Sequence, residues 1–589
     1  MSAQELITEH LDLWTGAVTK KSTSGRGSNG KVELTGVKKL RELILELAVR
    51  GKLVEQTPTD EPATRLLSKT KALREQLIRE GKLRRQKKTF SAEDIDKPFE
   101  IPASWSWATL PDVASYSPGK TPSTKAPKFW AAGASGIPWV SIADLNHNGT
   151  IRDTTKAVTQ TAADEVFRSE PVAPGTILMS FKLTVGKMSI TEVPAYHNEA
   201  IISILPFNGV SRDYLFKVMP MLALGGNAKR AIMGNTLNAT SMAQILVPLP
   251  PKEEQHRIVQ KVDELMALCD RLEQQTSDQL EAHETLTDTL LGTLTQSDNA
   301  TELADNWARL AAHFDTLFTT EQSIDKLKQT ILQLAVMGRL VERMESDTPV
   351  SKTLEMAANE KNKLAREGKV KKPKQQMPIT AMDKPFRIPS HWRWTRFGQL
   401  VTDFANGLYK PAKFYSSRGT ISLRMFNIQD GSITLEGARR VEIDDKEFSQ
   451  YRLAPGDILI NRVNSKELVG KAAVAPDSEE PMVFESMNMR ARLLIDHTES
   501  RYINLVLRSG FVKHYLLGLA KEAIGQASLN QTQISSIMIP FPPIEEQHRI
   551  VQKVDELMAL CDQIKERLNQ ASETRCQLAE AVVKGAIES

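Results

Sequence analysis

Apolar residues follow a coiled-coil spacing in two stretches of the chain. At alternating intervals of four and three residues, the first stretch has Ile258, Val262, Leu265, Cys269 and Leu272, and the second has Ile550, Val554, Leu557, Cys561 and Ile564. Such heptads are typical of a helix that buries one seam against another helix. The same frame continues through Leu286 to Leu290 and through Leu578 to Val582, and a proline pair precedes each stretch. We therefore predict two long antiparallel helices with their seams facing each other.

Other periodicities predict shorter elements. Residues 36–85 and 323–372 are rich in Leu, Ile, Lys and Arg and are interrupted by glycines, which predicts shorter helices. Residues 106–250 (the first insert) and 395–541 (the second insert) contain β-branched runs such as TILMSF and DILINRV between Gly, Pro and Asn. This alternation is typical of strands and turns, so each insert is predicted to mix helices and strands.

The chain contains an internal duplication. Residues 253–270 are identical to 545–562 at an offset of 292, while 43–55 resemble 330–342 and 96–107 resemble 383–394 at an offset of 287. Because the offsets differ by five, the block between these anchors has changed length. Solenoids need more and shorter repeats. Two long copies instead predict an α+β molecule with pseudo-two-fold symmetry.

The two inserts share only a thin skeleton. Pro174–Leu178 corresponds to Pro455–Leu459, Val185-Gly186-Lys187 to Val469-Gly470-Lys471, and Leu237-Asn238 to Leu529-Asn530. A duplicated structural domain whose middle drifted would also give this pattern, but it leaves the identical flanks unexplained. The predicted domains are an N-terminal helical region and linker (1–105), the first insert, a central helical region (251–394), the second insert and a C-terminal coiled-coil helix (542–589).

Composition narrows the class of protein. The 589 residues carry 76 Lys and Arg against 72 Asp and Glu, a net charge of +4, which excludes a histone-like protein but not local basic patches. Hydrophobic residues at 41% and charged residues at 25% exclude wholesale disorder. No apolar window is long enough for a membrane span, and the N-terminal residues do not form a secretory signal. Three cysteines favour a reducing compartment, so we expect a cytoplasmic protein without membrane contact.

Motifs for catalysis are missing. Residues 25–31 approach a P-loop, but Val32 stands where the Mg²⁺-binding Ser or Thr would be. His256 and His548 lack metal-ligand spacing, and the sequence has no nucleophile elbow, cysteine cluster or amino-methyltransferase motif. We therefore expect no active site, metal or cofactor in this chain.

Polar turns in the inserts are candidates for DNA contact. Lys182 and Lys187 bracket a turn after one strand, and Arg462, Lys466 and Lys471 follow the matching strand. Basic and small polar side chains on turns suit contacts to phosphates and base edges. A solvated charged loop fits the same residues, so both interpretations stay open.

The layout resembles the DNA-specificity subunit of a type I restriction–modification system. The residues that carry the resemblance are the helix starts PPKEEQHRIV and PPIEEQHRIV, then Gly119–Ser123, Gly136–Val140 and Asp144-Leu145, and the PGTILMS…VGK run. The second insert keeps PGDILINR…VGK but has Gly407–Pro411 and Ile421–Met425 in place of the earlier motifs. The second insert thus departs from the first in its early loops.

The resemblance implies a division of labour. The chain would recognise a bipartite, asymmetric site in double-stranded DNA. Two modification subunits would bind S-adenosylmethionine and methylate adenine, and restriction subunits would act as an ATP- and Mg²⁺-dependent motor nuclease. A self-contained methyltransferase and a non-enzymatic DNA-bridging coiled-coil protein are the alternatives. The turns, the skeleton and the resemblance together give these candidate DNA-binding residues: Lys120, Thr121, Ser123, Lys182, Lys187, Asn238, Arg424, Asn461, Arg462, Lys466, Lys471 and Asn530.

Overall fold

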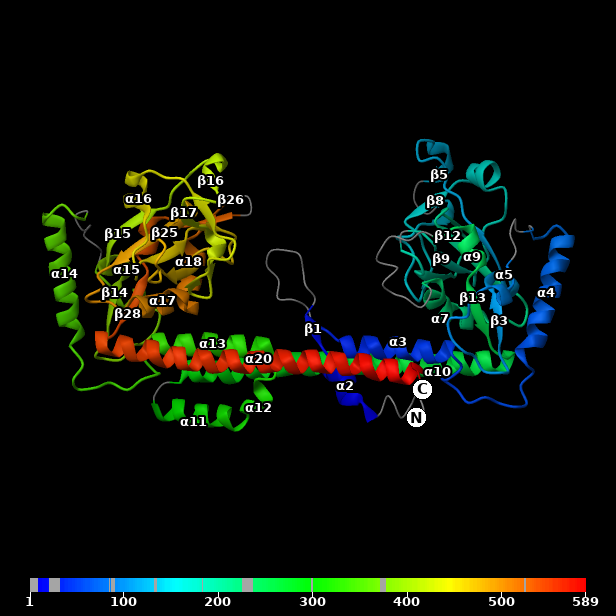
Figure 1. The fold of residues 1–589 in the computed structure, drawn as a ribbon, viewed down its shortest axis with the longest axis horizontal. Helices are drawn as coiled ribbons and strands as arrows, with labels where there is room; N and C mark the ends of the chain where they lie inside the picture. Colours follow the sequence, from blue (N-terminus) through cyan, green and yellow to red (C-terminus); the bar gives the residue numbers. More distant parts are fainter. Residues whose placement is uncertain are drawn as a thin grey trace. The chain divides into compact units, whose positions relative to one another are not determined.

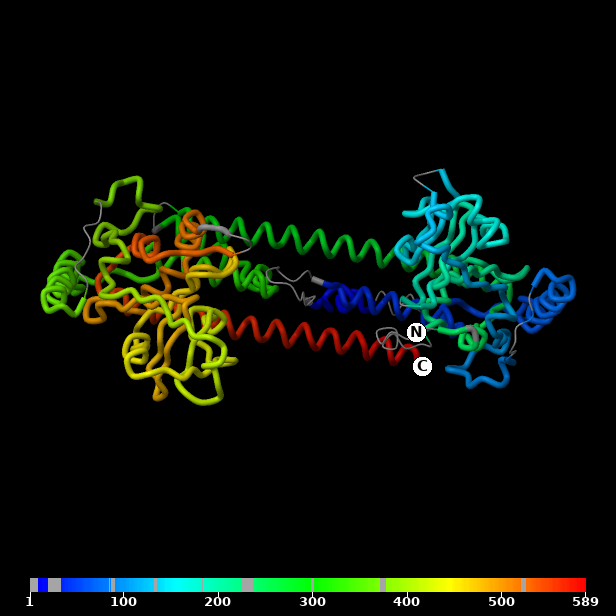
Figure 2. Tube along the Cα trace, turned by 90° about the horizontal axis from the view of Figure 1, so that it is seen from above, coloured from blue at the N-terminus to red at the C-terminus, as the bar shows by residue number. Residues whose placement is uncertain are grey.

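The chain folds into two compact units. A computed structural model describes residues 9–20, 32–83, 85, 90–131, 135–182, 184–224, 237–297, 300–370, 378–523 and 526–588, so the P-loop-like segment 25–31 lies outside the described residues. Among these residues, the first unit comprises the chain up to 278 together with 572–588, and the second comprises 279–571. Two 45-residue helices, α10 (Lys252–Gln296) and α20 (Ile544–Glu588), contribute a head to one unit and a tail to the other (Figures 1 and 2).

The first unit combines short scaffold helices with the first insert. Its remaining helices are α2 (Leu11–Gly16), α3 (Thr35–Val49), α4 (Ala63–Arg79), α5 (Leu110–Val113), α6 (Gln160–Ala162), α7 (Arg212–Ala223) and α9 (Ala239–Ala243). Its strands are β1 (Thr19–Lys20), β2 (Val32–Glu33), β3 (Ser106–Thr109), β4 (Ala114–Pro118), β5 (Trp130–Ala131), β6 (Ile137–Val140), β7 (Gly149–Ile151), β8 (Lys156–Val158), β9 (Ile177–Ser180), β10 (Met188–Thr191), β11 (Tyr196–His197), β12 (Ile201–Pro206) and β13 (Leu246–Leu249).

The second unit repeats this plan. Its helices are α11 (Ala300–Ala312), α12 (Phe314–Leu317), α13 (Glu321–Val336), α14 (Val350–Arg366), α15 (Phe397–Leu400), α16 (Asp445–Tyr451), α17 (Ser500–Arg508), α18 (Gly510–Leu519) and α19 (Gln531–Ser535). Its strands are β14 (Arg393–Arg396), β15 (Val401–Asn406), β16 (Tyr415–Ser416), β17 (Thr420–Leu423), β18 (Ile428–Gln429), β19 (Ser432–Ile433), β20 (Arg439–Val441), β21 (Ile458–Asn461), β22 (Val463–Asn464), β23 (Ala472–Val474), β24 (Met482–Phe484), β25 (Asn488–Leu493), β26 (Lys521–Ala523), β27 (Gln526–Ser528) and β28 (Met538–Phe541).

The two inserts share one sheet plan despite their divergent sequences. The first insert has a five-stranded sheet in the order β4-β12-β9-β10-β7 and a four-stranded sheet in the order β11-β6-β8-β5. The second has the corresponding sheets β15-β25-β21-β23 and β24-β17-β20-β16, and in addition the small sheets β18-β19 and β22-β27-β26. The parallel pair β6–β11 corresponds to the parallel pair β17–β24. This common topology assigns the early strands of the second insert, where motifs alone left the match uncertain. We call the sheets β11-β6-β8-β5 and β24-β17-β20-β16 the distal sheets.

Each unit contains a scaffold of three helices. In the first, Arg41 of α3 lies 2.7 Å from Asp270 in the head of α10, and Lys39 lies 3.9 Å from Glu580 in the tail of α20. The equivalent contacts recur in the second unit, where α13 reaches the head of α20 through Lys328–Asp562 and the tail of α10 through Lys326–Asp288, the latter at 2.7 Å. The same ion pairs therefore appear in both halves of the pseudo-symmetric chain.

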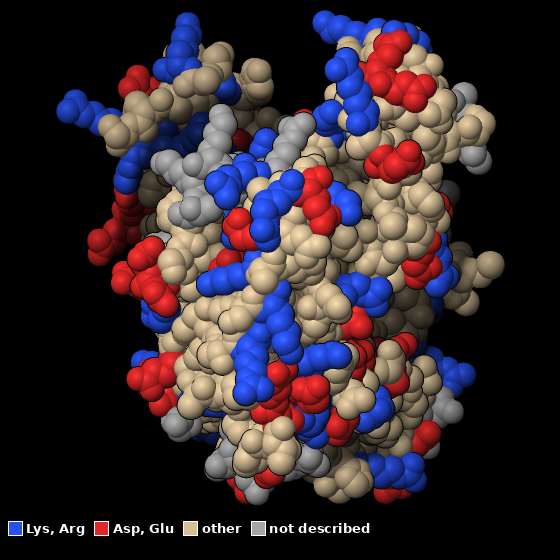
Figure 3. All heavy atoms as spheres, turned by 90° about the vertical axis from the view of Figure 1, so that its right-hand side faces the viewer, with Lys and Arg blue, Asp and Glu red and all other residues tan. Residues whose placement is uncertain are grey.

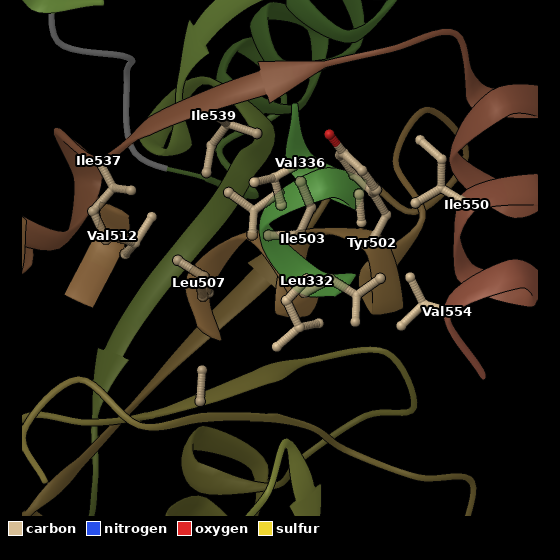
Figure 4. Packing of buried hydrophobic residues seen from close by; sticks show 14 of the residues in the cluster. Leu332, Val336, Tyr502, Ile503, Leu507, Val512, Ile537, Ile539, Ile550 and Val554 are labelled. Atoms are coloured by element: carbon tan, nitrogen blue, oxygen red, sulfur yellow. The ribbon is translucent and has the colours of Figure 1, made fainter. Parts of the chain in front are cut away.

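The seams of the long helices are buried, but they do not face each other. Ile258, Val262, Leu265 and Cys269 lie in one core with α3 and α7, and Ile550, Val554 and Cys561 lie in another with α13 and α17. Figure 4 shows the second core, where side chains of α13, α17 and α20 converge: Leu332, Val336, Tyr502, Ile503, Ile550 and Val554. Each core also contains the tail of the other long helix, with Ala579 in the first core and Leu291 and Leu294 in the second. The long helices therefore pack head to tail, together with the short repeat helices, and the two seam stretches lie in separate cores instead of on each other.

The heptad frame also fails in the tails of both helices. Leu286 and Leu578, which the frame places on the seam, are 52% and 51% exposed. The neighbouring Thr287, Leu294 and Ala579 are buried instead. Inward positions recur every eleven residues, as in Cys269, Leu280 and Leu291 or Cys561, Ser572 and Val583. A repeat of eleven matches the α-helical period more closely than a repeat of seven, so the buried face stays on one side of a nearly straight helix.

One buried cation differs between the two halves. In the first unit Arg74 of α4 lies 3.3 Å from Asp112, and both are largely buried. At the same offset of 287 the second unit has Lys361 and Gln399, so the carboxylate is replaced by a neutral amide. Lys361 Nζ donates a hydrogen bond of 2.6 Å to the carbonyl of Gly398. Burial without a counterion lowers the pKa of Lys361 to about 8.

The burial pattern of the tails predicts unequal effects of two leucine substitutions. Leu294→Ala removes a fully buried side chain and should cost about 2–5 kcal/mol of stability, whereas Leu286→Ala should change it by no more than about 0.5 kcal/mol. Thermal unfolding of the two variants beside the parent chain measures the difference. Equal destabilisation would show that the heptad frame, and not the eleven-residue frame, describes the tail.

The pKa of Lys361 predicts how stability depends on pH. The unfolded lysine keeps its proton up to about pH 10.4, while the folded one releases it near pH 8. The unfolded state thus binds more protons between these values, so this group makes the fold more stable as pH rises through that window. Gln399→Asp supplies the carboxylate found in the other half. It should raise the melting temperature at pH 7.5, with a gain that shrinks by pH 10; a gain independent of pH contradicts the assignment.

Candidate nucleic-acid interface

The identical starts of the two long helices join the helix to the insert. Gln255 accepts a 2.6 Å hydrogen bond from the backbone of Ser211 at the start of α7, and its amide donates to the carbonyl of Pro250. Gln547 makes the same pair of bonds to Glu499, at the start of α17, and to Pro542. Both glutamines are fully buried, so losing either bond would leave a polar group without a partner. The repeated sequence EEQHR is therefore explained by packing.

The adjacent glutamates complete these helix-start bonds. Glu546 accepts from Trp392 Nε1 at 3.0 Å, and its other oxygen lies 2.9 Å from His391 Nε2. Glu254 accepts from Gln56 at 2.6 Å, and its burial outweighs this bond, so its pKa is raised above the usual range. His256 and His548 are exposed on the first turns of their helices.

Two glycines mark equivalent loops of the inserts. A Cβ on Gly119 would lie 1.9 Å from the carbonyl oxygen of His197, and one on Gly407 would lie 2.2 Å from that of Glu485. Only glycine permits such close approach of two backbones. Gly407-Leu-Tyr-Lys-Pro therefore occupies the same place in the second insert as Gly119-Lys-Thr-Pro-Ser in the first.

The candidates in the Gly119 loop hold the loop in place. Lys120 Nζ donates to the carbonyls of Val166 and Phe167 at 2.8 and 2.9 Å. Thr121 donates to Glu199, and the carbonyl of Ser123 accepts from Trp130 Nε1 at 3.1 Å. Ser123 itself is exposed at the surface of the loop.

The turn after β9 presents two lysines differently. Lys187 Nζ donates to the carbonyl of Ile142 at 3.2 Å, whereas Lys182 Nζ lies 5.4 Å from the centre of the Phe181 ring. In the second insert Arg462 follows β21, and one of its guanidinium nitrogens donates to the carbonyl of Ser486 at 3.1 Å. Lys466 and Lys471 are exposed on the same turn.

Several other candidates have structural partners. Asn461 is fully buried and donates to Asn488 Oδ1 at 3.1 Å. The guanidinium of Arg424 lies 4.1 Å from the centre of the Phe426 ring and 3.9 Å from Glu485. Asn238 and Asn530 are the N-caps of α9 and α19, accepting from the backbone of Ser241 and Gln533 at 2.9 Å. Helix capping thus explains why Leu-Asn occurs in both inserts.

Sequence reasoning missed an aromatic pair on the distal sheets. Trp130 of β5 pairs with Val158 in the first insert, and Tyr415 of β16 pairs with Val441 in the second. Each follows a Lys-Phe dipeptide, 128–129 and 413–414, in which the lysine lies about 5 Å from the ring centre. The sequence does contain Lys-Phe followed by an aromatic residue in both inserts, but insertions and deletions between the inserts hid the alignment of these two segments.

Figure 3 shows Lys and Arg interspersed with Asp and Glu over the face of the first unit that carries α4. Within the described ranges, no group of His, Cys, Asp and Glu is placed to hold a metal ion. Burial lowers the pKa of His197 to about 4, which keeps its ring neutral. No helix among the residues that the structure describes is long and apolar enough to cross a membrane.

Comparison with known proteins identifies the family. Residues 102–282 and 431–573 match the family model of the type I restriction modification DNA specificity domain. The chain is 35% identical to the EcoEI specificity subunit and 36% identical to the EcoAI specificity subunit of Escherichia coli, in each case over the full length of both chains. A solved structure concerning assembly of the type I restriction–modification system covers 83% of this chain and 99% of its own, with a TM-score of 0.46 and 18% identity.

Matches of this identity over full-length relatives place the chain in a single family, whose members carry no cofactor themselves and recognise DNA within a larger complex. The chain belongs to the specificity subunits of type I restriction enzymes, the non-catalytic subunits that recognise DNA sequence for their restriction and modification partners.

Proposed function

We propose that this subunit recognises a bipartite, asymmetric DNA target through its two inserts. The observation that carries the proposal is that 106–250 and 395–541 have the same sheet plan and the same helix-start bonds but different surface loops. Equal scaffolds with unequal loops suit the recognition of two different half-sites. The first insert is then one target-recognition domain and the second the other, while 1–105, 251–394 and 542–589 form the scaffold.

The cations of the matching turns are our candidates for DNA contact. Lys466 and Lys471 are exposed on the turn that follows β21, while Lys182 and Arg462, on the matching turns, are half-buried. Basic side chains on turns can approach phosphates and base edges. Lys187 lies on the turn after β9, Thr121 and Ser123 lie in the Gly119 loop, and Arg424 follows β17; these four remain candidates. Lys120, Asn238, Asn461 and Asn530 already have hydrogen bonds inside the fold, so we assign them the role of holding the loops.

The scaffold supports a stoichiometry of two modification subunits. Leu286 and Leu578 are related by the offset of 292, and each leaves half of its side chain exposed on the tail of a long helix. Pseudo-equivalent positions of this kind suit two copies of the same partner. We infer that these modification subunits bind S-adenosylmethionine and methylate adenine, and that restriction subunits supply the ATP- and Mg²⁺-dependent steps.

Exchange of one insert predicts a change in one half-site. When residues 106–250 are replaced by the corresponding segment of a relative and the complex is reconstituted with its partner subunits, the bases of one half-site should change and those of the other should stay. Sequencing of methyladenine in DNA modified by the complex gives the target. A change in both half-sites, or in neither, contradicts independent recognition by the inserts.

A pair of substitutions separates DNA contact from loop support in the second insert. Arg462→Ala should weaken binding of the target duplex by about 1–3 kcal/mol and relax specificity in one half-site only. Asn530→Ala should instead lower stability by about 0.5–2 kcal/mol, and Asn530→Ser, which can still cap α19, should restore it. Binding isotherms and melting temperatures measure both effects. Unchanged affinity in Arg462→Ala for target and random DNA alike shows that the turn is merely solvated.

A further inference from the structure

A cavity opens on the distal sheet of the first insert. Its volume is about 580 Å³, and its lining includes one aromatic ring, two cations, one carboxylate and three threonines: Trp130, Arg152, Lys156, Asp153, Thr124, Thr154 and Thr155. Ligand-binding clefts commonly have volumes of about 300–1,000 Å³, with few polar groups converging on an apolar wall. None of these residues was singled out by the motifs in the sequence.

The aromatic wall of the cavity is fixed in place. Trp130 Nε1 donates to the carbonyl of Ser123, and the ring meets Trp139 edge-on with centroids 5.1 Å apart. Lys156 Nζ lies 5.5 Å from the centre of the Trp130 ring. The ring is thus oriented before any ligand arrives, which lowers the entropic cost of binding.

The polar wall is held by Asp144. This carboxylate accepts from the backbone of Thr155 at 2.9 Å and from that of Ser141 at 2.8 Å, which ties the strand end at β6 to the loop 152–155. Burial raises its pKa, but the hydrogen bonds from Ser141 and Thr155 outweigh burial, so the pKa lies below the usual range and Asp144 stays ionised. The Asp144-Leu145 dipeptide therefore positions the cavity wall.

The second insert places the same types of residue at the same positions of its distal sheet. Lys156 is paired with Trp139 on β6, and Arg439 is paired with Ser422 on β17, the corresponding strand. Since Tyr415 corresponds to Trp130, both inserts keep an aromatic residue on the first edge strand and a cation on its neighbour. Lys156 and Arg439 are both exposed. The inserts share little other sequence, so this agreement points to a common ligand.

The chemistry of the cavity matches one strand of a DNA duplex. Lysine and arginine at its rim can contact phosphate, whereas threonine methyl groups and an aromatic face suit the thymine methyl and other apolar base edges. The carboxylate of Asp153 can accept from the exocyclic amine of cytosine or adenine. A simple anion would leave the aromatic face of Trp130 without a contact, and an apolar ligand would bury the charges of Asp153 and Lys156 against an apolar surface. Arg152 is already ion-paired with Glu192 at 2.7 Å and adds positive charge to the rim.

We propose that this cavity is a DNA-contacting cleft of the first insert, in which Trp130 and Thr154 meet base edges while Lys156 and Arg152 hold the adjacent phosphates, and that Tyr415 and Arg439 do the same in the second insert. The proposal rests on the proposed recognition of a bipartite target. It adds the surface through which each insert meets its half-site.

The test uses the full chain reconstituted with its modification subunits. The methyladenine positions made by the parent complex define the target, and a duplex carrying that target is the probe for binding. Trp130→Ala and Lys156→Ala should each weaken binding of this duplex at least fivefold and relax the methylated sequence in one half-site only. Tyr415→Ala and Arg439→Ala should relax the other half-site. The matched control is Lys128→Ala, because Lys128 forms a 2.6 Å ion pair with Glu165 and does not line the cavity.

The outcomes distinguish failure of the proposed function from failure of the cleft. A parent complex that methylates no bipartite target overturns the proposed function itself. A parent complex that does so, with Trp130→Ala and Lys156→Ala retaining its affinity and sequence preference, overturns only the cleft. If Trp130→Ala lowers the melting temperature, the double variant Trp130→Phe/Lys156→Gln replaces it, because this variant keeps the side-chain packing and removes the positive charge. Parental binding and specificity in that double variant also count against the cleft, as does a loss of equal size in Lys128→Ala.

Discussion

The burial of a glutamine at the start of each long helix is the constraint on which the rest of the structure depends. Gln255 and Gln547 are fully buried, so their amide groups cannot bond to water. Each instead bonds to the start of an insert helix and to the carbonyl of the proline that follows the last strand of the insert. These bonds fix how the strand, the insert helix and the long helix meet. The surface loops of the inserts can then diverge in sequence, because the hydrogen bonds that attach each insert to its long helix are buried away from those loops.

Much of this architecture could be predicted from the repeated sequence segments. The duplication, the two long helices and the mixed inserts follow from identical segments and from hydrophobic spacing, and the structure confirms them. The partner of each seam could not be predicted, because a heptad shows that a face is buried but not what covers it. Ile258 and Ile550 belong to different cores for that reason. The drift from Leu286 to Thr287 depends on a period that a short window cannot distinguish from seven.

The candidate site was harder to predict than the fold. From the sequence alone, a repeated Asn in a turn fits both DNA contact and helix capping. In the structure, Asn238 and Asn530 are both helix caps. Lys120 resembles a phosphate ligand until its partners, two backbone carbonyls, are known. Trp130 and Tyr415 escaped notice because insertions shift their alignment, whereas strand register aligns them directly. Side-chain partners depend on long-range contacts that local sequence does not encode.

The eleven-residue repeat of the long helices has a consequence for how their length can change in evolution. Eleven residues make about three turns and about 16 Å of rise, so adding or removing that number returns every later side chain to the same face of the helix. Adding four residues instead rotates all later side chains by about 40° and carries Ala579 and its neighbours away from the core. Helix length in this scaffold is therefore expected to vary in coarse steps of eleven residues.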